Sequence, residues 1–303
     1  MNILITGGTG FIGQILNQYL QQHGHHTWVL TRDKVKAQKS LPVATHIIES
    51  LTQIPQTQGV DGVINLAGEP LMGKRWNRQN KQLFIDSRVN MTNDIIHFIQ
   101  QRKVKPEVLI NGSAIGFYGS EQTGVLDETS GSGDDFAASL CEQWEAAANK
   151  AVNLGVRVCS LRIGITLGAD GGPYKEMVAP FKLGLGATFG SGQQWMSWVH
   201  VGDLVNLIDF LLTHKGTSGV FNGTSPQPAT NADFSQQLGA ALKRPVWFKI
   251  PAAVLTILLG EAANLLLTGQ KVIPKQALDA GFTFAYPDLS SAFKQLTHKG
   301  GKA

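Results

Sequence analysis

The stretch MNILITGGTGFIG, residues 1–13, decides the fold. Its apolar run 3–5 predicts a buried strand, the glycine-rich residues after it predict a tight turn, and the residues from Phe11 onward predict a helix. Gly7, Gly10 and Gly13 have the spacing that lets backbone approach a pyrophosphate and lets the helix pack on the strand. Ordinary turns also contain glycines, but here a helix N-terminus follows and favours an anion. The stretch therefore predicts a dinucleotide-binding turn.

Length and composition are those of a compact globular protein. The chain has 303 residues, 43% hydrophobic and 16% charged, and such a length suggests about two domains. Cys141 and Cys159 give neither a disulfide framework nor metal-ligand spacing, so we expect reduced thiols and no metal. The start has no export signal, and the apolar residues 252–267 are too short and too polar to span a bilayer. We expect a cytoplasmic protein in which 252–267 is a buried or interface helix.

The charge pattern bears on partners. The net charge is +4, but the basic residues are scattered, and their main cluster, residues 32–36, follows a predicted strand. A small anionic cofactor explains that position better than a nucleic-acid duplex does. We therefore expect a small-molecule substrate and no nucleic acid. Because no segment is able to span a bilayer, we also expect no membrane partner, and we expect a monomer or a homodimer.

Strands and helices alternate through the first half of the chain. After the opening unit, strands are predicted at 26–31, 43–49, 62–68, 107–113 and 156–162, and helices at 11–23, 77–103 and 135–151. Strands separated in this way need parallel, right-handed crossovers. The expected fold class is α/β, with a Rossmann-type doubly wound parallel sheet that binds ligands at the carboxyl ends of its strands.

Beyond Gly164 the pattern changes to short elements punctuated by glycines. Helices are predicted at 203–212 and 231–242, with a short strand at 221–222 between them. The polar tail, residues 291–303, predicts a frayed end. This half is expected to be a smaller C-terminal α/β region that caps the sheet.

Several motifs carry a resemblance that covers residues 3–274. They read ITGGTGFIG, VINLAGEPL with GKRWN, SRVNMT, NGSAIGFYGS, LCEQWE, LRIGITLG, PFKLGLG, WVHVGDL, FNGTSPQPATN and LTGQKVIP. With them the sequence resembles the extended short-chain dehydrogenase/reductase superfamily, and within it the atypical branch of bacterial epimerase family proteins, which resemble NAD-dependent epimerases and dehydratases. The resemblance implies a nicotinamide dinucleotide as cofactor.

The superfamily's usual proton-transfer pair is missing. In a YxxxK motif, a tyrosine and a lysine move a proton while the nicotinamide exchanges a hydride. Taking Glu145 as the family's glutamate, Ala137 stands for the tyrosine and Cys141 for the lysine, and a shift of one residue gives Phe136 and Leu140. Neither pair transfers a proton, so the resemblance implies a departure from standard dehydrogenase chemistry.

Two hydroxyl side chains near the strand ends are the catalytic candidates. Ser113 either acts beside the nicotinamide or makes hydrogen bonds within a turn. Tyr118 either supplies the missing proton or is a packing element. Cys141 lacks the basic neighbour that a nucleophilic thiolate needs, so we expect a buried inert thiol. His200 is either a general base or, as the resemblance implies, packs the second region onto the first.

Arg32 selects between the two nicotinamide cofactors. An NAD site places an acid at the end of the second strand to hold the ribose 2′-OH, whereas an arginine there suits a 2′-phosphate. A solvated arginine on a turn is the alternative. Arg88 either reaches the cofactor, as the resemblance implies, or lies on a helix surface.

The predicted NADP(H) site joins the glycine turn, the second strand end, the loop after the fourth strand and, by resemblance, the nicotinamide side. Its residues are Gly7, Thr9, Gly10, Phe11, Ile12, Gly13, Thr31, Arg32, Leu66, Ala67, Gly68, Arg88, Arg162 and Ile163. Candidates for lining a pocket for a polar substrate are Lys74, Arg75, Trp76, Trp195 and Trp198.

These observations predict an NADP-binding Rossmann domain, residues 1–163, interleaved with a C-terminal substrate region, residues 164–303. The first hypothesis is an oxidoreductase or epimerase that acts on a small carbonyl or hydroxyl compound with a non-standard proton donor. The second is a non-catalytic NADP(H)-binding sensor or scaffold, which the missing pair favours. A methyltransferase is disfavoured, because its second strand normally ends in an acid.

Overall fold

A computed structural model describes residues 1–120 and 123–299 of the chain. Its larger part is a seven-stranded parallel sheet in the order β12-β7-β5-β4-β1-β2-β3. The strands are β1 (Asn2–Thr6), β2 (His26–Leu30), β3 (His46–Ile48), β4 (Gly62–Asn65), β5 (Val108–Ala114), β7 (Arg157–Ile163) and β12 (Gly219–Gly223). The order reverses between β1 and β4, where doubly wound sheets bind ligands. The predicted Rossmann-type fold is confirmed.

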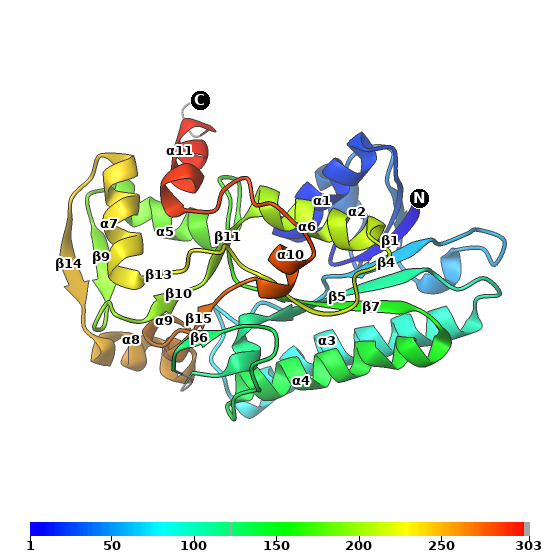
Figure 1. Cartoon of the computed structure of the whole chain (residues 1–303), viewed down its shortest axis with the longest axis horizontal. Helices are drawn as coiled ribbons and strands as arrows, with labels where there is room; N and C mark the ends of the chain where they lie inside the picture. Colours follow the sequence, from blue (N-terminus) through cyan, green and yellow to red (C-terminus); the bar gives the residue numbers. More distant parts are fainter. Residues whose placement is uncertain (121–122, 300–303) are drawn as a thin grey trace.

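Helices cover both faces of this sheet, as Figure 1 shows. One face carries α3 (Arg78–Gln101) and α4 (Phe136–Asn149), and the other carries α1 (Phe11–Gln22) and α6 (Val201–Thr213), with the short α2 (Lys34–Ser40) after β2. Residues 3–5 of β1 are completely buried. A central parallel strand is covered on both faces, which is why this run is apolar throughout rather than alternating.

The remaining elements are short and lie mostly at the opposite end of the molecule from α2 (Figure 1). They are β6 (Val125–Leu126), β8 (Ile165–Leu167), α5 (Gly172–Lys182), β9 (Gly186–Phe189), β10 (Trp195–Met196), β11 (Trp198–His200), β13 (Ala229–Thr230), α7 (Asn231–Leu242), β14 (Val246–Ile250), α8 (Ala252–Leu259), α9 (Asn264–Leu267), β15 (Lys271–Val272), α10 (Lys275–Asp279) and α11 (Leu289–Lys299), with 3₁₀ turns η1 (Leu51–Gln53), η2 (Ile115–Tyr118), η3 (Lys150–Leu154) and η4 (Gly260–Ala263). The short strands pair two by two, β9 with β14, β10 with β13, β8 with β11 and β6 with β15.

The sheet extends past residue 163. Its edge strand β12 and the helix α6 come from the second half of the chain, and Leu204, Leu207 and Ile208 of α6 are completely buried in the same core cluster as Ile3 and Ile5. The predicted division of the chain at residue 163 stays a prediction, and the two parts share one sheet.

Residues 291–299 of the polar tail form a packed helix, whereas the fraying predicted for its end stays a prediction. α11 buries Leu289, Ala292, Phe293 and Leu296 against α5 and α7. These four residues have helical spacing, one apolar stripe in an otherwise polar segment, and that stripe is enough for packing. Residues 300–303 of the predicted tail lie outside the described residues.

The apolar segment 252–267 is not a buried helix. α8 buries Leu255 but leaves Val254, Ile257 and Leu258 exposed, so the expectation of a buried helix is wrong and the alternative of an interface stays a prediction. None of the helices among the described residues has both the length and the apolar character needed to cross a membrane.

Candidate functional site

The glycine turn between β1 and α1 is shaped for close backbone approach. Gly7 has a φ of +70°, and a Cβ atom there would lie 2.4 Å from the carbonyl oxygen of Leu66. A Cβ on Gly13 would lie 2.3 Å from the Gly7 carbonyl oxygen. Gly10 is the N-cap of α1, and neither a capping side chain nor an acidic residue occupies the first turn. The first N–H groups of α1 are therefore available to an anion.

Arg32 lies at the open rim beside this turn. It follows β2, its side chain is 92% exposed, and its Nη2 lies 4.0 Å from Oε2 of Glu69. Glu69 accepts a hydrogen bond from Lys74 at 2.7 Å, and this bond lowers the pKa of its carboxyl group. Thr31 is engaged locally, because its Oγ1 accepts from the Asp33 N–H at 3.2 Å. The Arg32 guanidinium thus faces solvent, where its forked donors suit a phosphate.

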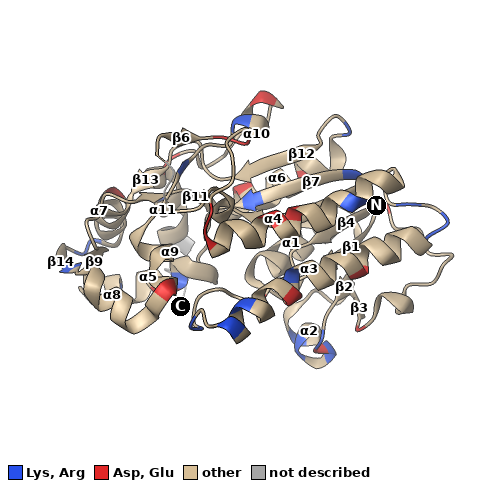
Figure 2. Cartoon of the chain, turned by 90° about the horizontal axis from the view of Figure 1, so that it is seen from below, with Lys and Arg blue, Asp and Glu red and all other residues tan. Residues whose placement is uncertain are grey.

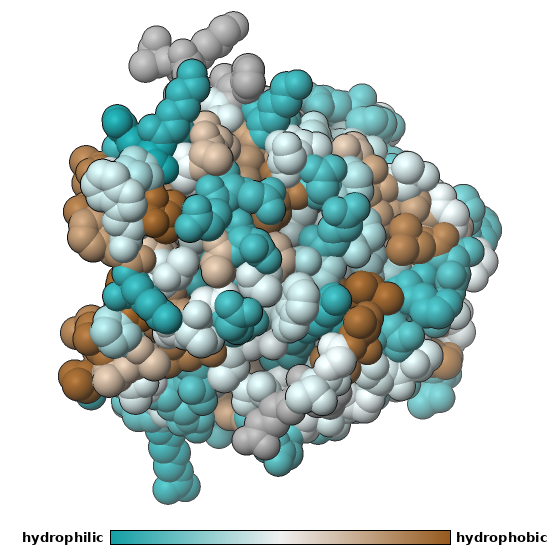
Figure 3. All heavy atoms as spheres, turned by 60° about the vertical axis from the view of Figure 1, so that its left-hand side comes forward, coloured by the Kyte–Doolittle hydropathy of each residue, from teal (hydrophilic) through white to brown (hydrophobic). Residues whose placement is uncertain are grey.

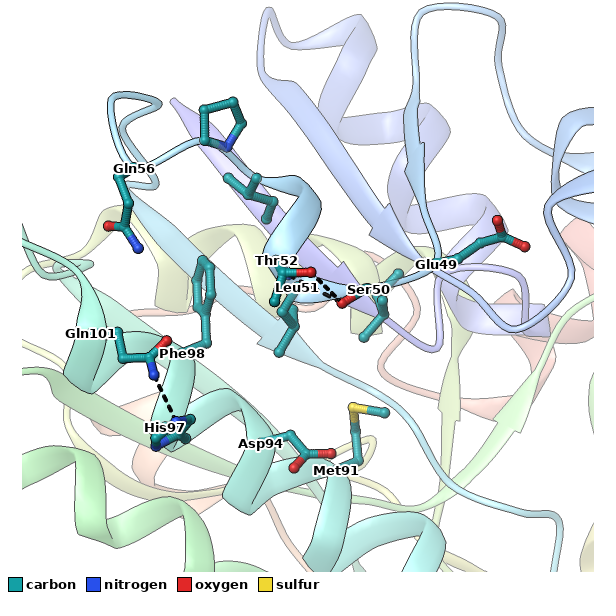
Figure 4. A pocket seen from close by; sticks show the side chains of 13 residues that line it. Glu49, Ser50, Leu51, Thr52, Gln56, Met91, Asp94, His97, Phe98 and Gln101 are labelled. Carbon is teal, nitrogen blue, oxygen red and sulfur yellow. Dashed lines mark hydrogen bonds between the residues drawn. The ribbon is translucent and has the colours of Figure 1, made fainter.

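A cavity of about 480 Å³ lies between α3 and the segment after β3 (Figure 4). Its wall includes Leu30, the last residue of β2, together with Ser50, Leu51 and Met91. Met91 lies within the motif SRVNMT, but the sequence motifs do not single out Leu30, Ser50 or Leu51. The only signal for them is position, since Ser50 and Leu51 follow a strand whose carboxyl end belongs to the ligand edge.

The loop after β4 passes directly over Arg88 of α3. A Cβ on Gly68 would lie 2.9 Å from the Arg88 guanidinium carbon. That guanidinium lies 5.2 Å from the Trp144 ring centroid, donates from Nη1 to the Phe84 carbonyl oxygen, and has a pKa lowered by burial. The predicted loop and the predicted arginine are therefore brought together, with an arginine packed into the floor of the site rather than spread on a helix surface.

Buried amides hold the strand ends that form this floor. Thr6 Oγ1 donates to Asn65 Oδ1 at 2.6 Å, and Asn65 Nδ2 donates to Thr92 Oγ1 at 2.9 Å and to Asn111 Oδ1 at 2.7 Å. Satisfied polar groups of this kind rigidify their surroundings, because leaving any of them unpaired is costly. β1, β4, β5 and α3 are thereby tied together beneath the glycine turn.

A second polar network lies under the ends of β5, β7 and β12. Ser113, Arg162 and Asn222 occupy the same register on these three strands. Ser113 Oγ donates to Glu145 Oε1 at 2.6 Å, and Arg162 binds both carboxylate oxygens of Glu145, at 2.8 and 2.9 Å. Arg162 Nη1 also donates to the Tyr118 hydroxyl oxygen at 3.1 Å, and that hydroxyl donates to Asn222 Oδ1 at 2.8 Å. The sequence motifs give no role to Asn222 and use Glu145 only for alignment.

This network places the catalytic candidates inside the protein. Tyr118 is completely buried and its burial raises the pKa of the phenol, which opposes the lowered pKa that a proton-exchanging tyrosine needs. Ser113 is also buried. Arg162 turns its guanidinium toward Glu145, while Ile163 packs against the core cluster below α6. The catalytic and cofactor roles of these four residues stay predictions.

The positions of the missing dyad are filled by closely packed small groups. Ala137 and Cys141 are both buried, and the Cys141 Sγ donates to the Ala114 carbonyl oxygen at 3.6 Å. Burial raises the pKa of this thiol to about 11, so it is protonated at neutral pH. A protonated thiol is a poor nucleophile.

Phe11 connects the glycine turn to the second half of the chain. A Cβ on Gly168, Gly171 or Gly172 would lie 2.5 to 2.7 Å from atoms of the Phe11 ring. The absence of side chains at these glycines therefore makes the space that the ring occupies. The ring of Phe11, the first residue of α1, therefore packs directly against the loop of residues 168–172.

The structure also shows the surroundings of three other candidates, and the pocket role of Trp76 stays a prediction. His200 caps α6, its Nδ1 accepting from the Gly202 N–H at 3.1 Å while Nε2 faces Gln295 Oε1 at 3.0 Å. The placement of Trp198 in a substrate pocket is wrong, because its ring is completely buried in the C-terminal core. Trp76 packs its ring against Phe136 at the start of α4.

Comparisons with known families and proteins agree with this architecture. The family model described as NAD dependent epimerase/dehydratase family matches residues 3–222, and a second, described as a domain of unknown function (DUF1731), matches residues 250–296. The chain is 42% identical to the chloroplastic epimerase family protein SDR39U1 homolog of Arabidopsis thaliana, over 98% of this chain and 86% of that protein. It is 36% identical to the epimerase family protein YfhF of Bacillus subtilis, over 98% of each.

Solved structures are similar over the same length. Human epimerase family protein SDR39U1 (isoform 2), solved with NADPH, superposes with a TM-score of 0.88 at 34% identity, covering 98% of this chain and 99% of that one. A UDP-glucose 4-epimerase from Thermotoga maritima, solved with UDP-glucose, gives a TM-score of 0.80 at 18% identity over 98% of each chain, which shows a common fold.

Proposed function

Because the chain belongs to the NAD dependent epimerase/dehydratase family, we propose that it binds NADP(H) and is an oxidoreductase or epimerase acting on a small carbonyl or hydroxyl compound. The resemblance drawn from the sequence motifs is confirmed at the level of this family. The proposal goes further in naming the phosphorylated cofactor, the reaction type and a substrate class.

The cofactor assignment rests on three features that lie together at the strand ends. The cradle at Gly7 and Gly13 has no room for side chains, an uncapped helix begins beside it, and Arg32 faces solvent at the end of β2. The first two features suit a pyrophosphate, and the third suits a 2′-phosphate. The relative solved with NADPH, 34% identical, supports the same choice.

The described residues have definable tasks in such a complex. The N–H groups of α1 would hold the pyrophosphate, Arg32 the 2′-phosphate, and the part of the cavity near Leu30, Ser50 and Met91 the adenosine. Bound at the strand ends, the cofactor would supply hydride chemistry. Arg88, held beneath Gly68, would place a positive charge under the loop at which phosphates and polar substrates gather.

An enzyme of this type needs a proton donor, and the standard donor residues are missing here. Ala137 and Cys141 offer no acid, and Tyr118 is buried with its hydroxyl bonded to Asn222 and Arg162. Ser113 remains, held by the carboxylate of Glu145. The same observations favour the second candidate function, a non-catalytic NADP(H)-binding sensor or scaffold.

Titration with NADPH and NADH tests the cofactor. We expect NADPH to bind at least tenfold more tightly, since hydrogen bonds to a charged group contribute about 1.5–3 kcal/mol. Arg32→Ala is expected to remove that preference while leaving NADH binding unchanged. Arg78→Ala, which changes an exposed arginine at the start of α3, is the matched control. Equal affinities for the two cofactors in the wild-type protein would overturn the assignment.

Turnover separates the two functions. The protein is incubated with NADPH and a panel of small aldehydes, ketones and sugar derivatives, and cofactor oxidation is followed. Turnover that is lost in Ser113→Ala and kept in Cys141→Ser would support the enzyme with Ser113 in its proton path. Cofactor binding without turnover on any compound would support the sensor or scaffold.

A further inference from the structure

One end of the molecule presents apolar side chains to solvent. β9 and β14 pair in parallel, so the loops that lead into them lie side by side. These loops and strands expose Leu183 (77%), Leu185, Trp247 (82%) and Phe248. Isolated exposed apolar residues are ordinary, whereas several on adjacent loops and strands are typical of an interaction site. Figure 3, which brings this end forward, shows separate apolar groups at its left edge, with hydrophilic residues between them.

The helix after β14 enlarges this surface. α8 exposes Val254, Ile257 and Leu258, which have the i, i+3, i+4 spacing of one helix face, while Leu255 points into the protein. A surface helix normally turns its polar face to water. Here the outward face is apolar. We name Leu183, Leu185, Trp247, Phe248, Val254, Ile257 and Leu258 the apolar end.

Basic residues are interleaved with the apolar end. Lys182 precedes Leu183, Lys243 and Arg244 precede β14, and Lys249 lies within it. All four are exposed, and none of them forms an ion pair within the described residues. Residues 177–202 and 234–260 contain no Asp or Glu. Figure 2 shows basic residues at β14.

We propose that the apolar end docks this protein onto an anionic membrane surface. Exposed tryptophan and leucine side chains enter the boundary between headgroups and acyl chains, while lysine and arginine are attracted to anionic lipids. A second copy fits less well, because two-fold pairing of this end would bring eight cations together, twice the four named above, while residues 177–202 and 234–260 supply no acid to offset them. The proposal departs from the expectation of no membrane partner, which rested on the lack of a spanning segment.

Flotation of the full-length protein with lipid vesicles tests the proposal. We expect it to float with vesicles containing one third phosphatidylglycerol and not with pure phosphatidylcholine, and to be released by high salt. Lys243→Glu with Arg244→Glu should weaken binding at least tenfold, since each surface cation contributes about fivefold. Trp247→Ser with Leu183→Ser should weaken it independently of salt.

The control variant makes one apolar change and one charge reversal of the same kinds elsewhere on the surface. Val43→Ser with Lys39→Glu alters an exposed apolar and a basic residue after β2, far from the apolar end along the chain. We expect it to bind vesicles like the wild-type protein. Equal weakening in the control would overturn the proposal in favour of general attraction by the net positive charge. No flotation, or a dimer in sedimentation that Trp247→Ser with Leu183→Ser dissociates, would also overturn it. Melting temperatures verify that each variant is folded.

Discussion

Gly7 and Gly24 have similar backbone conformations in different surroundings. Their φ angles are +70° and +79°, but a Cβ on Gly7 would meet the Leu66 carbonyl oxygen at 2.4 Å, whereas one on Gly24 would meet nothing within 4 Å. Backbone strain is therefore common to both positions. Only at Gly7 does a side chain also collide with the loop that lines the site.

We expect Gly7→Ala to abolish NADPH binding and to destabilise the fold by more than Gly24→Ala does. The control is expected to cost about 1–2 kcal/mol, the strain of a left-handed backbone in a residue other than glycine, and to leave NADPH binding intact. Calorimetric unfolding and NADPH titration of both variants measure this. Retained NADPH affinity in Gly7→Ala would show that the turn does not cradle the cofactor.

Removing the hydroxyl of Tyr118 tests how much its hydrogen bonds contribute to stability. Tyr118→Phe leaves Asn222 Oδ1 without its donor and Arg162 with one acceptor fewer, so we expect a loss of about 1–3 kcal/mol in the free energy of unfolding. Tyr174→Phe is the matched control. That ring is buried too, its pKa is raised to about 12 by burial, and its hydroxyl has no hydrogen bond to the described residues. Loss of turnover in Tyr118→Phe without loss of stability would instead identify a catalytic phenol.

At the scale of elements, β5, β7 and β12 act together through their register. Ser113, Arg162 and Asn222 lie in one row across the sheet, and the ion pair between Arg162 and Glu145 joins this row to α4. Removing one partner of a buried pair is costly, because it leaves an uncompensated charge. The row of Ser113, Arg162 and Asn222, through the ion pair with Glu145, therefore determines where α4 packs on the sheet.

The contact between α1 and α6 is expected to be sensitive to acid. His25, just after α1, lies with Nε2 3.9 Å from Asp209 Oδ1 of α6, and burial lowers its pKa from the ordinary 6.5, helped by the N-terminus and His23 and opposed by Asp209. The unfolded chain then takes up this proton more readily than the folded protein. The neutral imidazole of His25 therefore contributes fully to the stability of the fold above pH 6.5, and this contribution is lost as the pH falls through the pKa of His25 in the folded protein.

Melting temperatures measured across the titration range of histidine check this expectation. The decrease on acidification should be smaller in His25→Gln than in the wild-type protein, because the proton uptake by the unfolded chain at this site is removed. His97→Gln, an exposed position on α3, should follow the wild-type curve. The same slope in His25→Gln and wild type would assign the acid sensitivity to other groups.

At the scale of the whole molecule, the two halves of the chain share a core. α6 covers the face of the sheet next to α1, and β12 extends its edge. A fragment of residues 1–163 would expose the apolar surface that Leu204, Leu207 and Ile208 cover. We expect that fragment to aggregate or to lack a cooperative thermal transition, and co-expression with residues 164–303 to restore both folding and NADPH binding. A cooperative transition of the isolated fragment, seen by circular dichroism, would contradict this.

Much of the site could be predicted because its signals are local. The glycine turn, the ends of β2 and β4, and Arg32 follow from apolar runs, glycine spacing and strand order, which neighbouring residues determine. The four-residue stripe of α11 and the exposed face of α8 could not be assigned in this way, because composition does not say which side of a helix another element covers.

The sequence by itself determined a Rossmann-type sheet with a phosphate-binding turn at its start, since backbone geometry and hydrophobic periodicity are properties of short segments. Only the tertiary structure decided which hydrogen bonds Ser113, Tyr118 and Arg162 make. Their hydrogen bonds depend on the register of β5, β7 and β12 and on the approach of Glu145 from α4. Those partners are far apart in the chain, and long-range packing brings them to within hydrogen-bond distance, turning predicted site residues into a buried network.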